Sequence, residues 1–332
     1  MTNKYSIKTS ISNHYKRFKE SLSTPLQRRL FFNRIMKFIV NILKYILIIG
    51  LCFVILYPIL LQLAIAFRAP EDVNNPAILW IPEQFSIKNF EVAMLALKYW
   101  EALRYTFILS FFITLLQLVS TTLAGYAFAR LKFRGSTILF AFALFTIIVP
   151  QTVISLPLLR SITKMGLIDK PMTLFLMSGL GMGIRSGIFI YLFRQFYRGI
   201  PLELEEAAIV DGASAFQVFH KIMLPNAKPA LITVGLLSFV WQWNDFYFTK
   251  LFSGGKYFTL TTQQVAIEYG LQGALVEAKV WGLLGQDITG NPYFVSMILN
   301  TSGILIMLPL LIIYFFVQKM FVEGIERSGI VG

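Results

Sequence analysis

Long apolar runs dominate this sequence and set the limits on what it can fold into. One of them is ILIIGLCFVILYPILLQLAIAF, and several others of similar length follow it. About 20 consecutive apolar residues suffice for a helix to cross a hydrocarbon layer ~30 Å thick. Of the 332 residues, 56% are hydrophobic and only 14% are charged, whereas about a quarter of the residues in soluble domains are charged. We therefore predict a polytopic membrane protein rather than a single soluble core.

The apolar runs predict an all-α fold with six transmembrane helices. Their expected bounds are 44–67, 105–127, 137–159, 171–193, 229–250 and 293–317. An even number of spans places both termini on one side of the membrane. If that side is the cytoplasm, the inside segments hold 19 Lys and Arg residues and the outside segments hold 10. This asymmetry predicts cytoplasmic N- and C-termini.

A basic N-terminal arm, residues 1–43, precedes the first span. Ten of the 30 Lys and Arg residues lie before residue 45, against the single acid Glu20. Such an arm is typical of a cytoplasmic flank held near anionic lipid, so membrane lipid and not nucleic acid is the expected partner. The apolar run that follows is longer than the 7–15 residues of a signal-peptide core, so we expect it to remain as a span. The single Cys52 excludes an intramolecular disulfide.

Helix breakers interrupt several of the predicted spans. Pro150 and Pro157 bracket QTVISL, and should kink or interrupt the third span near its outer half. The fourth span starts with small residues that favour close helix packing, namely Gly179, Gly181, Gly183 and Gly187. Arg185 lies in this span, where an ionisable group needs a partner or a water-filled cavity. A buried ion pair and a contact with a transported solute are both consistent with it.

A polar segment, residues 200–226, separates the fourth and fifth spans on the predicted cytoplasmic side. Pro201 suits the first turn of a short helix, and Gly212 can adopt the positive φ that ends one. Ser214 can cap a second helix, which Pro225 then stops.

Apolar residues of the second helix, including Phe216, Phe219 and Met223, recur at helical spacing. An amphipathic hairpin of this kind lies either on a bilayer surface or in a protein groove. Surface helices prefer Lys and Arg, whereas four acids lie between Glu203 and Asp211. Docking onto a protein is therefore favoured.

This segment resembles the E-A-A-x3-G-x9-I-x-L-P motif of inner-membrane subunits of binding-protein-dependent ATP-binding-cassette importers. The seven matching residues are Glu206, Ala207, Ala208, Gly212, Ile222, Leu224 and Pro225. The stretches IPLELEEAAIVDGAS, WNDF and FVEGIERSGIVG are similar to the carbohydrate branch, specifically to the smaller, MalG-like partner of a maltose-type permease pair. The resemblance covers roughly residues 44 to 332.

The resemblance implies the type I importer permease fold, in which the motif forms a coupling helix seated in a cleft of a cytoplasmic ATPase subunit. Glu206, Ala207, Ala208 and Gly212 would form the docking turn. Ile222, Leu224 and Pro225 would fix its link to the fifth span.

The expected partners follow from the same resemblance. They are a second homologous permease subunit, two ATPase subunits that bind ATP and Mg²⁺, and an extracellular solute-binding protein. The chain itself would bind no cofactor and catalyse no bond change. It would reside as a multi-pass protein in a prokaryotic cell membrane.

The sequence also supplies candidates for the substrate path. Trp241, Asn244, Asp245 and Phe248 have i, i+3, i+4 and i+7 spacing, which on one helix would give an aromatic and polar face suited to a sugar. Gln242 and Arg185 are the other two candidates for the substrate path. An interfacial aromatic belt explains the same aromatic residues.

The sequence also predicts where two further segments lie, and it leaves three alternative functions to be weighed. We expect residues 251–292 to lie outside, near the binding protein or the entrance, and the tail 318–332 to lie in the cytoplasm. A non-carbohydrate cargo is the nearest alternative, because the motif is shared well beyond sugar importers. A secondary carrier is disfavoured because no acidic residue lies near the middle of a span, and a membrane enzyme because His and Cys do not cluster.

Overall fold

Helices form all the regular structure of the residues that the computed structural model describes, namely 25–73, 75, 81–253, 258–277 and 290–329. An isolated antiparallel bridge between Arg68 and Phe85 is the nearest approach to a strand within these ranges. The predicted all-α fold is therefore confirmed. The chain divides into two units, Met1–Gln62 and Leu63–Gly332.

The first unit contains most of a single helix, α2 (Pro25–Ala66, 42 residues). It begins well before residue 44, where we predicted the first span to start, and continues without a break past Pro58. Its apolar side chains are almost all exposed, from Leu26 to Leu60. From residue 45 onward the helix carries no charged residue and is apolar on nearly all sides, which suits a lipid environment.

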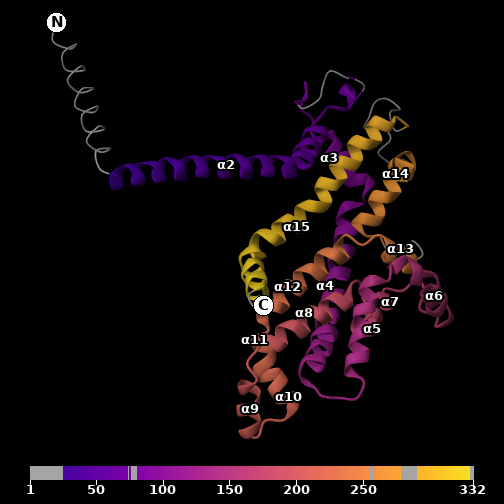
Figure 1. Ribbon diagram of the computed structural model, residues 1–332. Coiled ribbons are helices and arrows are strands. Elements are labelled where there is room, and N and C mark those ends of the chain that lie inside the picture. The colour runs from indigo at the N-terminus through magenta and orange to yellow at the C-terminus, as the bar shows by residue number, and fades with distance from the viewer. Residues whose placement is uncertain (1–24, 74, 76–80, 254–257, 278–289, 330–332) are drawn as a thin grey trace. The chain divides into compact units, whose positions relative to one another are not determined.

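The second unit is built around α4 (Tyr99–Arg130), which packs against α8 (Ser186–Gly199) and α12 (Lys228–Trp243). The helix α15 (Pro292–Gly329) packs against the other side of α12 (Figure 1). Small and polar side chains of α4 are buried along its length: Thr106, Ser110, Gln117, Thr121, Thr122 and Gly125. Such side chains let neighbouring helices approach closely in a membrane.

The third predicted span is two helices, α5 (Ser136–Ile148) and α6 (Gln151–Lys164), which meet at an angle of 109°. Pro150 lies at the junction with extended backbone, whereas Pro157 lies inside α6. The predicted interruption is confirmed at the first proline, because a proline disfavours the helical conformation in the residue before it.

The fourth and fifth spans were predicted as continuous helices, and the structure corrects both. The fourth is divided between α7 (Met172–Gly179) and α8, and the fifth between α12 and α13 (Tyr247–Ser253). Gly181 (φ 73°) and Arg185 (φ 56°) have left-handed backbone in the first break, which is incompatible with a helix.

The predicted close packing of the glycine-rich stretch is confirmed at Gly187. A Cβ atom added there would lie 2.4 Å from Thr146 Oγ1 and 2.6 Å from the carbonyl oxygen of Ala143.

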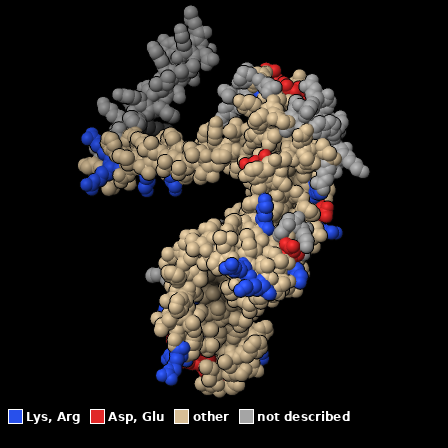
Figure 2. Space-filling model, turned by 90° about the vertical axis from the view of Figure 1, so that its right-hand side faces the viewer, with Lys and Arg blue, Asp and Glu red and all other residues tan. Residues whose placement is uncertain are grey.

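Among the described residues, three helical segments are long and apolar enough to cross a membrane: Arg28–Ala66, Tyr99–Arg130 and Pro292–Met320. Two bent pairs, α5 with α6 and Ala215–Asn226 with α12, raise this number to five if each pair is one span. Figure 2 shows that most of the visible surface bears no Lys, Arg, Asp or Glu.

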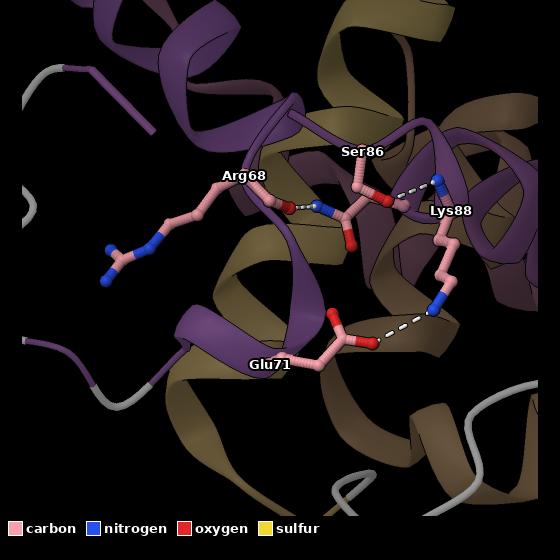
Figure 3. A network of polar contacts seen from close by, with 5 residues as sticks. Arg68, Glu71, Ser86 and Lys88 are labelled. Atoms are coloured by element: carbon pink, nitrogen blue, oxygen red, sulfur yellow. Dashed lines mark hydrogen bonds and ion pairs between the residues drawn. The ribbon is translucent and has the colours of Figure 1, made fainter. Parts of the chain in front are cut away.

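A clasp of polar contacts lies at one end of the second unit and includes residues of η1 (Pro70–Asp72) and α3 (Lys88–Ala96). It is formed by Arg68, Glu71, Ser86, Lys88 and Asn89. Lys88 Nζ lies 2.9 Å from Glu71 Oε1, and the backbone N–H of Lys88 donates to Ser86 Oγ (Figure 3). Asn89 Nδ2 donates to the carbonyl oxygens of Ala66 (3.1 Å) and Arg68 (2.7 Å).

The clasp end also contains α14 (Leu260–Glu277), which packs against α3. The short helices α9 (Glu203–Val210), α10 (Ala215–Val218) and α11 (Leu224–Asn226) lie at the opposite end (Figure 1). Within the predicted outer segment 251–292, residues 260–277 form α14, while residues 254–257 and 278–289 fall outside the described part of the chain.

Candidate functional site

The segment 200–226 forms the helix–glycine–helix hairpin that its sequence predicts. Three acids, Glu203, Glu205 and Glu206, occupy the first turn of α9, where they complement the positive end of the helix dipole. Gly212 (φ 84°) ends the helix, and the Ala213 N–H donates to the Ala208 carbonyl oxygen at 2.9 Å. Only glycine adopts this φ without a steric penalty.

Ser214 caps α10 as predicted. Its Oγ accepts from the Gln217 N–H at 3.4 Å, and the Ser214 N–H donates to Gln217 Oε1 at 2.8 Å, which completes a capping box. One turn of π-helix, η2 (Phe219–Met223), leads into α11. The chain then bends by 75° into α12, two residues after Pro225.

One face of the hairpin is buried against the rest of the second unit. Ala208, Val218, Phe219 and Met223 are each at most 7% exposed. They belong to an apolar cluster whose other members include Tyr126 of α4 and Phe193 and Tyr197 of α8. This face therefore anchors the hairpin to α4 and α8.

An ion pair reinforces this buried face. Arg130 Nε, at the end of α4, lies 3.2 Å from Glu205 Oε1, and only 11% and 10% of the two side chains are exposed. Arg130 also donates a hydrogen bond to the carbonyl oxygen of Ile200, which ends α8. Burial raises the pKa of Glu205 above its ordinary value, and the positive charge of Arg130 opposes this effect.

The opposite face of the hairpin is exposed and largely apolar. Val210 is 86% exposed and Phe216 is 72% exposed. Glu206, Ala207 and Gly212 lie on this exposed side.

The seven residues of the motif are therefore divided between an exposed group and a buried or half-buried group. Ala208 is buried in the anchoring face. Ile222 and Leu224 are half-buried, and Pro225 is exposed. Asn226 Nδ2 donates to the Ile222 carbonyl oxygen at 2.7 Å and stabilises the turn into α12.

The four path candidates predicted to share one helical face, Trp241, Asn244, Asp245 and Phe248, do not form it, because α12 ends at Trp243 and Asn244 is its C-cap. Asp245 instead caps α13: its carboxylate accepts from the Thr249 N–H and from Thr249 Oγ1, both at 2.7 Å. Gln242 and Phe248 are buried. These three side chains are structural in the described conformation.

Gln242 and Phe248 line a cavity of about 340 Å³ between α6, α7 and α13. Most of its other walls are apolar, with Ser161 and Ser178 as polar exceptions.

Arg185 and Trp241 come together although 56 positions separate them in the chain. The guanidinium carbon of Arg185 lies 4.5 Å from the centroid of the Trp241 ring, and this ring stacks on Phe189 at 5.2 Å. Arg185 forms no ion pair with another described residue. Arg185 and Asn244 are exposed, and Trp241 is half-exposed. These three are the predicted path residues that remain accessible.

Sequence reasoning missed two residues that position these features. Arg130 holds the hairpin in place. The only sequence feature that could have indicated this is its helical spacing, because it follows Tyr126 by four residues and Thr122 by eight on one face of α4. Gln117 holds the break before α8: its Nε2 donates to the Ile184 carbonyl oxygen and to Ser186 Oγ, both at 2.8 Å. Ser238 Oγ of α12 donates to Gln117 Oε1 at 2.7 Å.

Residues 121–327 match the model of a family described as the binding-protein-dependent transport system inner membrane component. The chain belongs to this family. The match starts within α4, just before the Thr122, Tyr126 and Arg130 stripe, and includes the whole hairpin. As an inner membrane component of an ABC transport system, the protein resides in the cell membrane.

Two curated inner membrane components are similar over nearly their whole length. The arabinooligosaccharides transport system permease protein AraQ of Halalkalibacterium halodurans is 27% identical over 88% of this chain and 98% of its own. The maltodextrin transport system permease protein MdxG of Bacillus subtilis is 26% identical over 88% of this chain and 96% of its own.

A solved structure of a bacterial ABC transporter involved in the import of the acidic polysaccharide alginate has a similar fold. One of its chains superimposes with a TM-score of 0.67 and 22% identity, over 85% of this chain and 96% of that chain. This inner membrane component thus shares its helical fold with that chain.

Proposed function

We propose that this inner membrane component is one of two permease subunits of a carbohydrate importer and that the hairpin 200–226 docks onto a partner ATPase. The chain makes no bond change itself, and ATP and Mg²⁺ bind to two ATPase subunits in the cytoplasm. An extracellular solute-binding protein delivers the cargo, most simply an oligosaccharide. ATP-driven closure then switches the pathway between its outward- and inward-facing forms.

The observation that supports docking is the division of the hairpin into two faces. One face is anchored by an apolar cluster and the Arg130–Glu205 ion pair, and the other presents Val210 and Phe216 to the surroundings. A firmly held helix with an exposed apolar face fits a groove in a protein partner. The acids of α9 disfavour the anionic bilayer surface as the alternative.

The proposed topology has six spans with both termini in the cytoplasm. The three apolar helices and the bent pair of α5 and α6 supply four of these spans. The helix α7 with the start of α8 would supply another, and α12, without the hairpin residues 215–226, would supply the last. In this arrangement the hairpin lies inside and the clasp lies outside, at opposite ends of the second unit (Figure 1).

A carbohydrate cargo is supported by the names of relatives that handle arabinooligosaccharides and maltodextrin. Within the chain, the half-exposed Trp241 beside the exposed Arg185 and Asn244 offers a surface for stacking on and hydrogen-bonding a sugar.

Docking is tested by co-purifying the chain with its own partner subunits. We expect Phe216→Asp and Val210→Asp to reach the membrane but to retain little ATPase subunit, while Phe216→Tyr retains it. Gly212→Trp should leave the subunit in the membrane but separate ATP hydrolysis from uptake, because a bulky side chain disfavours the positive φ. Undiminished ATPase retention in both aspartate variants would contradict the docking proposal.

Cargo is tested by measuring which solute stimulates ATP hydrolysis of the reconstituted complex through the binding protein. Maltodextrins and arabinooligosaccharides are the first probes. Stimulation by an amino acid or a metal ion, and by no glycan, would overturn the carbohydrate assignment while leaving the importer assignment intact.

A further inference from the structure

We infer that Arg130 is a positioning residue that ties the hairpin to α4, so that α4 transmits the motion of the docked ATPase into the membrane. This inference rests on the proposed function, because it presumes that the hairpin is the docking site. In the sequence the hairpin is joined only to α8 and α12. The inference adds α4 as a third helix that carries the motion of the hairpin.

Three residues spaced four apart form a contact stripe at the hairpin end of α4: Thr122, Tyr126 and Arg130. Thr122 Oγ1 lies 2.6 Å from the Tyr197 hydroxyl oxygen in a buried hydrogen bond. The Tyr126 ring packs against Tyr197 at 5.6 Å and against Phe219 of the hairpin at 5.0 Å. Arg130 then reaches the hairpin itself. The stripe therefore connects α4 with α8 and with both arms of the hairpin.

Arg130 is the member of the stripe that fixes the hairpin by charge. Its guanidinium contacts the Glu205 carboxylate and the Ile200 carbonyl oxygen at the same time. These two partners flank the entry into α9, so one side chain sets both the position and the start of the first hairpin helix. A planar guanidinium group can lie beside a carboxylate while it donates a hydrogen bond to a carbonyl oxygen, whereas the single ammonium group of lysine is less suited to this.

The direct connection from the hairpin to α12 is irregular. It passes through the π-helical turn Phe219–Met223 and the 75° bend at Ala227. By contrast, α4 is one unbroken helix of 32 residues, about 48 Å long at 1.5 Å per residue. At its far end the Tyr99 hydroxyl donates to the Leu305 carbonyl oxygen of α15. A displacement applied at Arg130 would therefore reach α15 near the opposite end of the unit along a stiff element.

The test needs a readout that does not depend on the cargo. We would use the assembled complex with Cys52→Ser to remove the native thiol and Asn244→Cys as a reporter in the proposed path. The rate of labelling by a membrane-impermeant maleimide is measured with and without a non-hydrolysable ATP analogue and Mg²⁺. The variants compared on this background are Arg130→Gln, Arg130→Lys, Glu205→Gln and the double Arg130→Gln/Glu205→Gln. Arg134→Gln is the control, because Arg134 is exposed and four residues further on.

We expect the nucleotide to change the labelling rate about tenfold in the control, within the usual range for coupling between sites. Arg130→Gln and Glu205→Gln should remove most of this change while the ATPase subunits still co-purify. Arg130→Lys should retain part of it. The double variant should be no worse than either single variant, since the two side chains act as one unit. It also leaves no lone buried charge, so it supplies the test if a single variant fails to assemble.

A full nucleotide response in an assembled Arg130→Gln or double variant would overturn the inference and leave the docking proposal standing. Loss of assembly in all four variants would also overturn it, because the ion pair would then serve folding alone. If the unmodified chain retains no ATPase subunit, the proposed function itself fails.

Discussion

Arg130 Nε and Glu205 Oε1 lie 3.2 Å apart with only 11% and 10% of their side chains exposed, so two opposite charges are buried together where α4 meets the hairpin. Removing both charges from water is costly, and a buried ion pair often adds little net stability compared with an apolar pair of similar volume. Its value lies instead in fixing one geometry, which is the property that a coupling element needs.

The first prediction concerns the stability of this pair. Arg130→Met leaves the Glu205 carboxylate buried without a counter-charge, and we expect it to lower the unfolding free energy by up to about 3–5 kcal/mol. The double Arg130→Met/Glu205→Leu should be close to the unmodified protein. Thermal unfolding of the purified protein in detergent measures both. If the double variant is as unstable as Arg130→Met, the charges stabilise the fold directly.

The second prediction concerns pH. Burial raises the pKa of Glu205 in the folded protein, so the folded state binds the proton more tightly than the unfolded state does. The contribution of this group to the unfolding free energy therefore rises as the pH falls through the folded pKa. At the same time the ion pair loses its negative charge. Relative to Glu205→Gln, the unmodified protein should gain thermal stability as the pH falls toward the ordinary Glu pKa of about 4.3, while its nucleotide response weakens.

A relative loss of stability over the same pH range would contradict the direction of this pKa shift. Glu203→Gln is the matched control, because Glu203 lies in the same helical turn but is exposed. We expect it to give the same pH profile as the unmodified protein.

Local signals in the sequence predicted the hairpin well. Pro201, the three acids, Gly212 and Ser214 specify where each short helix starts and stops, because each acts through its own backbone. The same signals could not show which face of α9 is buried, since Ala207 and Ala208 are identical residues with opposite exposure. That distinction depends on α4 and α8, which are distant in the chain.

The breaks in the fourth and fifth spans were harder to predict. Apolar composition specifies that a segment enters lipid but not that it is one helix. The break before α8 is stabilised by Gln117, a residue more than 60 positions away. Likewise, Asp245 was assigned to the path because of its spacing, whereas its carboxylate is used to start α13.

The third prediction concerns the contact between α4 and α8. A Cβ atom at Gly125 would lie 2.4 Å from Phe193 Cβ and 3.0 Å from the Arg194 nitrogen. Gly125→Ala should therefore force the helices apart and cost about 1–3 kcal/mol. Gly50→Ala on α2 is the control, because no atom lies within 4 Å of the position of its Cβ. It should be neutral or stabilising by up to ~1 kcal/mol. Equal melting temperatures for the two variants would show that the contact can relax.

The fourth prediction concerns the buried hydroxyl pair Thr122 and Tyr197, whose oxygens are 2.6 Å apart. Tyr197→Phe removes one partner and should cost about 1–3 kcal/mol, since the other hydroxyl is left buried without it. Thr122→Val/Tyr197→Phe should cost less than the sum of the two single changes. Additive losses in a thermal unfolding cycle would show that the two groups do not interact.

The fifth prediction separates residues of the path from residues of the scaffold. Arg185→Gln and Trp241→Ala should weaken uptake and raise the cargo concentration that gives half-maximal stimulation of ATP hydrolysis. Arg185 is exposed and Trp241 is half-exposed, and Arg185 forms no ion pair with another described residue. Asp245→Ala should instead cost about 0.5–2 kcal/mol of stability through the lost cap of α13, with the half-maximal cargo concentration unchanged. Uptake kinetics measured beside thermal unfolding distinguish the two classes. If Asp245→Ala shifts the cargo concentration while Arg185→Gln does not, the path runs along α13 rather than across the face formed by Arg185 and Trp241.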